Sequence, residues 1–471
     1  MSSVPDPNAK SARFTTGPTM RHVLVMCGAG STGLVAIFLV DFANLFYISL
    51  LDDPTLTAAV GFAGVILYFH MSFCVGLMIA AVALTSRAIG ADNPRRARQV
   101  AGSALTIIVI MTGALALVSL PLIDPMLDLV GAKGETHRIA AGYMWITIPT
   151  TPLLGAAMGL IGILRSAGDA KRSMYSTLVL GLTTAVLDPI LIYGLGYGVT
   201  GAAVVTVVAR ALTVAYGLSV AIRVHDIVAR PTVKAAVADF VPLARIGGPA
   251  VLTNIATPVG NSIVTAQVAV FGDHAVAGWT IVARLIPVAF GVLFALPGAI
   301  GPIIGQNFGA GALARVRQTL VDSMIVTTVY TLVVSVALFA GRDMIVAFFG
   351  ASGEAAHLVQ FFCEYLAFSY VFGGGIFVSV AAFNNLGFPM RATLFNWARA
   401  TIGTIPFVWV GAHLGGAEGA LAGFAIGAIP FGILALFVVS RTIDRLAGQL
   451  RQASHEGVLP EAARAESRSG L

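Results

Sequence analysis

Charged side chains are scarce in this chain of 471 residues, where lysine, arginine, aspartate and glutamate together make up 11% of the sequence. A soluble globular domain carries about 25% of these residues, so this chain has too few charges to cover a surface that faces water. Hydrophobic residues account for 57% of it and the mean hydropathy is +0.89. This composition excludes an ordinary soluble domain and predicts an integral membrane protein.

Cysteine is also scarce, with three residues that all fall in apolar segments, Cys27, Cys74 and Cys363. An odd number without metal-ligand spacing predicts neither a disulfide framework nor a firm metal site, so we interpret them as small core residues. The first 20 residues lack the apolar core of a signal peptide, and we expect no leader. ATP-binding loops, redox motifs and nucleophile–base sets are missing as well, which predicts a protein that is not an enzyme and needs no cofactor.

Long apolar runs are abundant instead. Runs such as 102–123, 174–193 and 202–222 are about 20 residues long and can cross ~30 Å of hydrocarbon as helices. Within lipid the backbone must satisfy its own hydrogen bonds, which leaves helices or closed barrels, and the runs do not alternate with the period of a strand. The sequence therefore predicts an all-α integral membrane protein with twelve transmembrane helices. We place them at 22–50, 56–86, 98–123, 136–163, 173–196, 199–222, 241–271, 275–304, 318–341, 356–386, 392–412 and 416–440.

Basic residues are distributed unevenly between the two sides of the predicted bundle. An even number of helices puts both termini on one side, and nearly all lysines and arginines fall in the tails and loops of that side. The opposite side holds Lys133, Arg138 and Arg342. The positive-inside rule therefore predicts cytoplasmic termini, and we expect the bacterial inner membrane as the location. The net charge of +6 is explained by topology, and we expect no nucleic-acid partner.

The two halves of the chain share a repeat at an offset of 219 residues. Gly90-Ala91 followed by Arg96 recurs as Gly309-Ala310 followed by Arg315. Because six is an even number, the two six-helix copies have the same orientation, and we expect two pseudo-symmetric bundles around an axis along the membrane normal. The expected organisation is a cytoplasmic tail at 1–20, a first bundle at 21–222, a cytoplasmic linker at 223–240, a second bundle at 241–440 and a disordered cytoplasmic tail at 441–471.

Motifs in equivalent loops of the two halves resemble the multidrug and toxic compound extrusion (MATE) family. They include Ser86-Arg87-Ala88-Ile89-Gly90-Ala91-Asp92, Leu187-Asp188-Pro189 and Gly305-Gln306-Asn307-Phe308-Gly309-Ala310, and the resemblance runs from about residue 20 to 440. It implies a V-shaped pair of six-helix bundles that exports cationic or amphipathic organic compounds in exchange for H⁺ or Na⁺. Gly373-Gly374-Gly375 stands where one bacterial subgroup carries an aspartate. This is the pattern of the DinF-like subgroup, in which coupling belongs to the N-terminal bundle.

Asp41 is the first candidate for coupling, because it lies deep in the first predicted helix beside Phe42. A charge at the centre of a membrane helix costs roughly 2.5 to 3.5 kcal/mol on insertion scales, so such residues are usually functional. The carboxylate could exchange a proton, or bind Na⁺ together with Asn44 one turn away. The alternative is a structural carboxylate bound by a neighbouring helix. The resemblance matches Asp41 with the family's coupling aspartate in this helix.

Asp188 is the second candidate, directly before Pro189 in the fifth predicted helix. Thr184 lies one turn earlier, and Thr206 in the next helix is expected at similar depth. The resemblance implies a polar network of these positions, with Thr184 in place of the usual asparagine. Arg210 lies about as deep as Asp188, so two interpretations stay open: either Asp188 titrates, or it forms a fixed ion pair with Arg210.

The substrate cavity and the partners are predicted less directly. Six aromatic residues and one amide could line a cavity for a flat cation, although most aromatics in such helices only pack: Phe42, Phe46, Phe69, Asn261, Trp279, Phe290 and Phe294. Arg284 and Arg399 are interpreted as snorkelling from helix ends. We expect a monomer whose partners are a small organic substrate and the lipid bilayer. The alternative function is a flippase of lipid-linked precursors, for which a more cationic cavity is expected.

Overall fold

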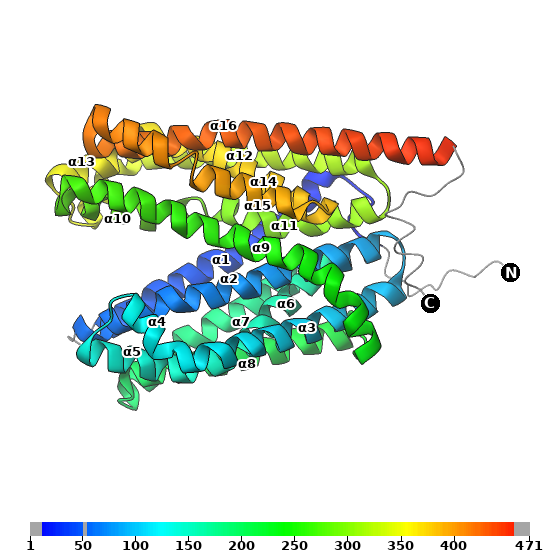
Figure 1. Cartoon of the computed structure of the whole chain (residues 1–471), viewed down its shortest axis with the longest axis horizontal. Helices are drawn as coiled ribbons and strands as arrows, with labels where there is room; N and C mark the ends of the chain where they lie inside the picture. The colour runs from blue at the N-terminus through cyan, green and yellow to red at the C-terminus, as the bar shows by residue number, and fades with distance from the viewer. Residues whose placement is uncertain (1–11, 50–53, 456–471) are drawn as a thin grey trace.

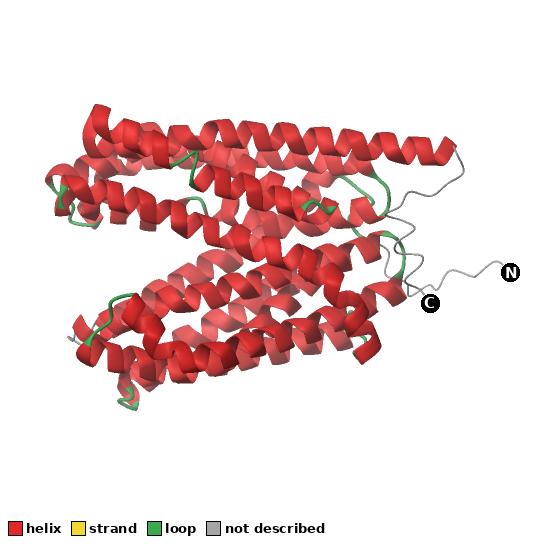
Figure 2. Cartoon of the chain, in the orientation of Figure 1, coloured by secondary structure: helices red, strands yellow, loops and turns green. Residues whose placement is uncertain are grey.

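The computed structural model describes residues 12–49 and 54–455, with the side chains of 37–49, 54 and 453–455 excepted, and in this part helices joined by loops are the regular structure (Figure 2). The first half contains α1 (Thr19–Ser49), α2 (Pro54–Gly90), α3 (Pro94–Ser119), α4 (Ile123–Leu129), α5 (Gly134–Thr147), α6 (Thr151–Ser166), α7 (Ala170–Pro189) and α8 (Gly198–Arg223). The second half contains α9 (Val233–Val268), α10 (Asp273–Ala289), α11 (Gly291–Gly309), α12 (Leu313–Phe348), α13 (Gly353–Phe361), α14 (Tyr370–Leu386), α15 (Pro389–Ala400) and α16 (Ile405–His455).

These helices make twelve membrane crossings. Ten spans among the described residues are long and apolar enough to cross a bilayer. One of them, Pro389–Gln452, reverses direction at Gly415 and Gly416, where the backbone leaves the helical region, and so crosses twice. The helix α1 supplies the remaining crossing, whereas α10 and α11 are the two successive halves of a single crossing that is broken at Phe290. The predicted fold class is confirmed.

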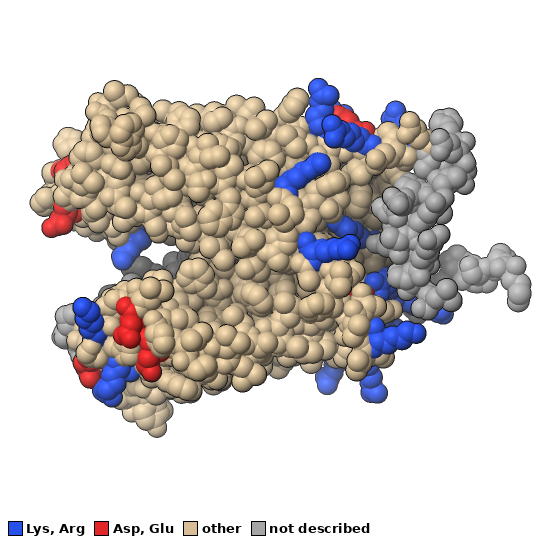
Figure 3. Space-filling view, viewed as in Figure 1, with Lys and Arg blue, Asp and Glu red and all other residues tan. Residues whose placement is uncertain are grey.

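The crossings form two bundles, α1 to α8 and α9 to α16, which meet at one end of the molecule and diverge at the other (Figure 1). The start of α1 and the end of α16 lie at the end where the bundles meet, and most lysines and arginines on the visible face gather there (Figure 3). At the opposite end the surface is hollowed between the bundles (Figure 3). The fold therefore has a V shape, with a cleft that opens away from the termini. On which side of the membrane the termini lie stays a prediction.

Glycines allow the bundles to touch where they meet. Here α2 packs against α9 and α11, and α1 packs against α11. A Cβ atom at Gly90 would overlap the carbonyl of Gln306, and one at Gly309 would overlap the carbonyl of Arg87. Gly90 and Gly309 are equivalent in the 219-residue repeat, so the same close crossing is made by both bundles. Small residues at a helix crossing are what permit backbones to approach this closely in membranes.

The segment before α1 strengthens this closed end. The backbone N–H of Phe14 donates to the side-chain oxygen of Gln306 (3.0 Å), and the Gln306 amide donates in turn to the carbonyl of Ser166 (2.7 Å). Arg315 donates to the carbonyls of Phe14 and Gly17, at 2.9 Å each. Because Ser166 belongs to the first bundle and Gln306 and Arg315 to the second, residues 14–17 help to hold the two bundles together.

Two of the helix boundaries that differ from those expected concern the predicted linker and the predicted tail. α9 begins at Val233, inside the segment 223–240 that was expected to be a linker, because the Thr232 side chain caps it by accepting from the N–H of Ala235 (3.2 Å). α16 continues to His455, beyond the expected start of the disordered tail at residue 441. The reason is that Leu446 and Leu450 still pack against the core of the second bundle.

A candidate ion-coupling site in the first bundle

Asp188 is the buried carboxylate around which the candidate site is built. It lies at the end of α7, where Pro189 lacks a backbone N–H and the chain continues as one π-helical turn at Ile190–Gly194. Its side chain is 1% exposed, and neither carboxylate oxygen has a hydrogen-bond partner in the part of the chain that the structure describes. An unpaired buried charge is costly, so the site favours a proton or a cation on this carboxylate. Single π-turns of this kind are frequent at functional sites.

Arg210 does not neutralise Asp188. Its guanidinium donates to the carbonyl of Thr147 (3.0 Å) and to the hydroxyl of Thr150 (2.7 Å), at the junction between α5 and α6. The interpretation in which Arg210 and Asp188 form a fixed ion pair is therefore corrected. The rotation of α8 about its axis turns the Arg210 side chain toward α5. Arg210 and Asp188 were predicted to lie at similar depths in the membrane, but depth alone does not bring them together.

The hydroxyls of Thr184 and Thr206 donate to carbonyls of their own helices. Thr184 bonds to Leu180 and Thr206 to Ala202, at 3.0 Å each. Neither hydrogen atom is directed at Asp188, but each hydroxyl oxygen keeps lone pairs that can accept a hydrogen bond or bind a cation. The side chains of four further predicted residues lie outside the described ones: Asp41, Phe42, Asn44 and Phe46.

The predicted aromatic lining is found only in part. Phe69 of α2 is exposed, and Asn261 of α9 is exposed as well. Phe290 is fully buried and stacks on Tyr370, with ring centroids 4.4 Å apart. Trp279 is buried and donates to Thr265 (2.8 Å), while Phe294 packs against Phe377 inside the same core. Trp279 and Phe290 therefore fill the space between helices of the second bundle and do not line a cavity in this structure, whereas the cavity role of Phe294, which is partly buried, stays a prediction.

The comparison with known families agrees with this architecture. A model of the MatE family matches residues 32–190 and 249–410, which together exceed half of the chain and fall one in each bundle. The chain belongs to the MatE family. It is therefore a multi-pass membrane protein of a family of multidrug efflux transporters, and a transporter rather than an enzyme.

Individual MatE proteins resemble the chain over most of its length. A FAD transporter of Shewanella oneidensis is 26% identical to this chain, and the similarity covers 91% of this chain and 96% of the transporter's length. The multidrug export protein MepA of Staphylococcus haemolyticus is 25% identical over 86% of this chain and 89% of its own. The Vibrio cholerae MATE transporter VcmN in its bent form superimposes with a TM-score of 0.85 at 24% identity, covering 91% of this chain and 98% of VcmN. A MATE transporter structure described as outward-facing gives a TM-score of 0.87 at 21% identity, covering 93% of this chain and 98% of that one.

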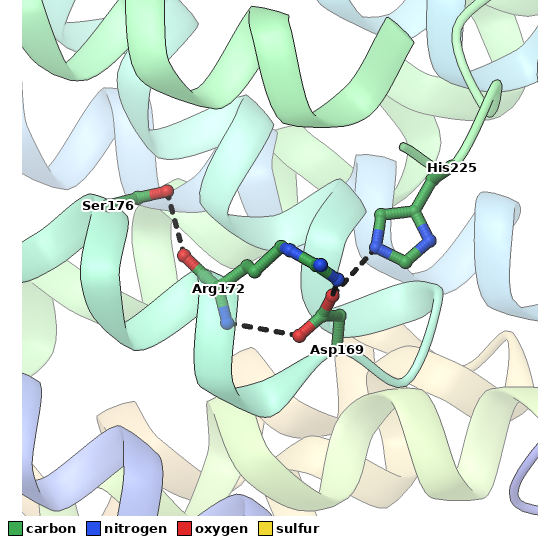
Figure 4. Close-up of polar contacts among 4 residues, drawn as sticks. All are labelled: Asp169, Arg172, Ser176 and His225. Atoms are coloured by element: carbon green, nitrogen blue, oxygen red, sulfur yellow. Dashed lines mark hydrogen bonds and ion pairs between the residues drawn. The ribbon is translucent and has the colours of Figure 1, made fainter. Parts of the chain in front are cut away.

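This MatE protein also has a polar cluster at its closed end that the sequence did not reveal (Figure 4). Asp169 caps α7 by accepting from the backbone N–H of Arg172 (3.0 Å), and its other oxygen accepts from the Arg172 guanidinium and from the His225 ring, at 2.7 Å each. The Ser176 hydroxyl donates to the Arg172 carbonyl (3.1 Å). The cluster ties the start of α7 to the chain that leaves α8. An aspartate three residues before an arginine at a helix start signalled the cap, but nothing in the sequence signalled His225.

Asp169 should make the stability of this MatE protein depend on pH. Burial raises the pKa of Asp169, but the hydrogen bonds from Arg172 and His225 outweigh burial and hold the pKa below its usual value. A depressed pKa stabilises the folded state above the unfolded pKa of about 3.9, and this contribution is lost as the pH falls through the folded pKa. We therefore expect Asp169→Asn to lower the melting temperature at pH 7, and we expect the difference from wild type to shrink as the pH falls below about 4, the unfolded pKa.

Thermal unfolding of the purified protein in detergent between pH 3 and pH 8 measures this difference. Asp226→Asn is the matched control, since Asp226 is near His225 but its ion pair with Arg98 is exposed, and such pairs contribute little. An Asp169→Asn deficit that stays constant across the whole pH range would contradict the expected linkage.

Proposed function

We propose that the protein is a secondary active antiporter that exports amphipathic organic compounds across the bacterial inner membrane in exchange for H⁺ or Na⁺. The observation that carries this proposal is Asp188, a carboxylate buried in a transporter fold with no hydrogen-bond donor among the described side chains. Such a carboxylate binds a coupling cation and releases it when its surroundings change. A proton that crosses a potential of 100 mV gains ~2.3 kcal/mol, which is enough to drive a solute gradient of tenfold or more.

The packing of α1 on α7 supports a site shared by both helices. A Cβ at Gly33 of α1 would lie 3.1 Å from Thr177 of α7, which fixes the level of one helix against the other. Thr184 and Asp188 follow Thr177 by seven and eleven residues, spacings that return to the same face of a helix. The two helices run in the same direction, so positions 41 and 44 of α1 reach this level. Asp41 and Asn44 are therefore proposed as partners of Asp188 in holding the ion.

The identity of the ion follows from the number of oxygen atoms that gather around it. A proton requires one carboxylate, whereas Na⁺ favours several oxygen ligands. Asp188, Thr184 and Thr206, with Asp41 and Asn44 from α1, would form such a set in the first bundle, the pattern of the DinF-like subgroup. Alternating access would then couple the ion to the substrate, with the cleft open on the side opposite the termini.

The substrate class is proposed from the relatives. MepA is named a multidrug export protein, and the Shewanella relative is named a FAD transporter. We therefore take both a cationic dye and a flavin as test compounds for this chain, which we propose to act as a monomer. The flippase alternative finds no support among these relatives.

Transport into everted inner-membrane vesicles tests the proposal. Ethidium and riboflavin 5′-phosphate are supplied under an imposed proton gradient or sodium gradient, for wild type and for Asp41→Asn. We expect one gradient to drive uptake of at least one compound in wild type and to fail in Asp41→Asn. Asp273→Asn, at the exposed start of α10, is the matched control and should transport normally. Uptake of neither compound under either gradient would refute the antiport proposal, and normal uptake by Asp41→Asn would remove Asp41 from the site.

A further inference from the structure

Arg284 is an exposed arginine in α10, and within the described residues its guanidinium has no hydrogen-bond or ion-pair partner. It lies eleven residues after Asp273, where α10 begins. At 1.5 Å per residue this is about 16 Å along the helix, near the middle of ~30 Å of hydrocarbon. The expectation that Arg284 snorkels from a helix end is thereby corrected. A guanidinium at this depth is costly in lipid, so its exposed face requires water or a counter-ion.

The second half of the same crossing, α11, packs on the first bundle. A Cβ at Gly291 would lie 3.6 Å from Val35 of α1, and one at Gly30 of α1 would lie 3.5 Å from Ala295. α10, which precedes the break at Phe290, also contacts α1. Arg284 lies on the side of α10 that is turned away from its own bundle. It thus points toward the first bundle at a level where the bundles have already diverged, which is the wall of the cleft.

The core-facing side of α10 agrees with this orientation. Gly278 packs on Ala355 of α13, where an added Cβ would lie 3.0 Å from the Ala355 backbone. Val282 and Ile286, one and two turns later on the same side, are buried in the second bundle. Arg284 is on the opposite side of the helix, together with Thr280 and Val288, which are also exposed.

The facing wall of the cleft is apolar and aromatic. Gly76 of α2 meets Val251 of α9 so closely that a Cβ there would overlap it, which marks the face of α2 that turns toward the second bundle. Phe69 and Val65 precede Gly76 by seven and eleven residues, share that face, and are 52% and 51% exposed. In the repeat, Val65 is the equivalent of Arg284. The cleft therefore pairs an apolar wall in one bundle with a guanidinium in the other.

We propose that Arg284 is a substrate-binding residue and that the transported compound carries an anionic group, a carboxylate or a phosphate, on an aromatic body. A guanidinium presents a planar fork of N–H donors that matches either anion, and it remains charged at every physiological pH. The aromatic body would lie against Phe69 and Val65 while the anion binds Arg284. This inference rests on the proposed antiport and names organic anions and zwitterions as the preferred class among its amphipathic substrates.

A pair of flavins that share one ring system tests this inference. Riboflavin is neutral, and riboflavin 5′-phosphate adds a phosphate. In everted vesicles under the effective gradient, we expect wild type to take up riboflavin 5′-phosphate faster than riboflavin. Arg284→Ala should lower uptake of the phosphate by about tenfold or more, the usual effect of losing a hydrogen bond between charged groups, and should change uptake of riboflavin and ethidium by less than about twofold. Arg284→Lys should keep part of the activity, because a point charge remains.

Control variants separate a binding role from a structural one. Thr280→Ala removes a neutral side chain one turn away on the same face and should leave the preference for the phosphate unchanged. Val65→Arg places a second guanidinium at the equivalent position and should raise the preference further. Equal loss of all three compounds in Arg284→Ala and Arg284→Lys, at wild-type expression, would overturn the inference. So would a wild type that transports ethidium but not riboflavin 5′-phosphate, a result that leaves the antiport proposal intact.

The anion could belong to a soluble compound or to a lipid headgroup. A parallel assay in proteoliposomes follows the movement of fluorescent phosphatidylglycerol between leaflets. Arg284-dependent movement of riboflavin 5′-phosphate alone supports a soluble aromatic anion. Arg284-dependent movement of the lipid alone supports an anion site at Arg284 but overturns the soluble substrate. Movement of either one that does not depend on Arg284 overturns the assignment of the site.

Discussion

Replacing Asp188 by asparagine is expected to reduce gradient-driven transport to the level of vesicles without the protein. Asparagine keeps the size and shape of the side chain but can neither carry a proton nor supply a charge to a sodium ion. The melting temperature should be unchanged or higher, because the wild-type carboxylate is buried, no residue that the structure describes donates to it, and burial penalises its charged form. Transport under the effective gradient and thermal unfolding in detergent, measured on the same preparation, check both parts.

Asp239→Asn is the matched control for this variant. Asp239 is as deeply buried as Asp188 but forms an ion pair with Arg96 (2.5 Å) near the start of α9. Removing one partner of a buried pair leaves the other charge uncompensated, so this variant should melt at a lower temperature while its folded fraction still transports. A lower melting temperature with intact transport in Asp188→Asn itself would show that Asp188 is structural.

Replacing Gly90 by alanine is expected to open the closed end of the molecule. A Cβ at Gly90 would overlap the carbonyl of Gln306, so α2 and α11 must separate at the crossing that seals the cleft from the side of the termini. Overpacking of this kind costs about 1–3 kcal/mol, which shifts the balance between two conformations by about 5- to 150-fold. Transport should fall, because alternating access requires the end at the α2–α11 crossing to open and close by turns, and the variant can no longer close it.

The reactivity of a single cysteine at position 86 reports this opening. Ser86 is fully buried in α2 at the contact with Gly305, so Ser86→Cys, in a chain whose three cysteines are replaced, should be protected from maleimides. Gly90→Ala should raise the labelling rate by about tenfold. Gly64→Ala in the same helix is the control, since a Cβ there meets no atom within 4 Å. Unchanged labelling in Gly90→Ala would show that the crossing tolerates a methyl group and that Gly90 does not control the closed end.

The composition of the chain and its internal repeat were sufficient to predict the architecture. Low charge, apolar runs and a repeat at 219 residues predicted twelve helices in two bundles, because the hydrophobic thickness of a bilayer acts on each segment separately. The same features located Asp188 as a deep carboxylate. Motifs in the loops were sufficient to predict the family. These motifs contain Gly90 and Gly309, which are required by a close helix crossing that both bundles make.

The rotation of each helix about its axis was decided only by the tertiary structure. Helices in lipid are apolar on every side, so the periodicity that marks a buried face in a soluble protein is weak here. For this reason the sequence predicted that Arg210 lies about as deep as Asp188, but it could not show that the Arg210 side chain points away from Asp188. In the same way, Phe290 was predicted to line a cavity although its ring is packed in the core. The contact of His225 with Asp169 joins residues 56 positions apart. The sequence by itself determined which segments cross the membrane, and the packing between helices decided which side chains face the core, the cleft and one another.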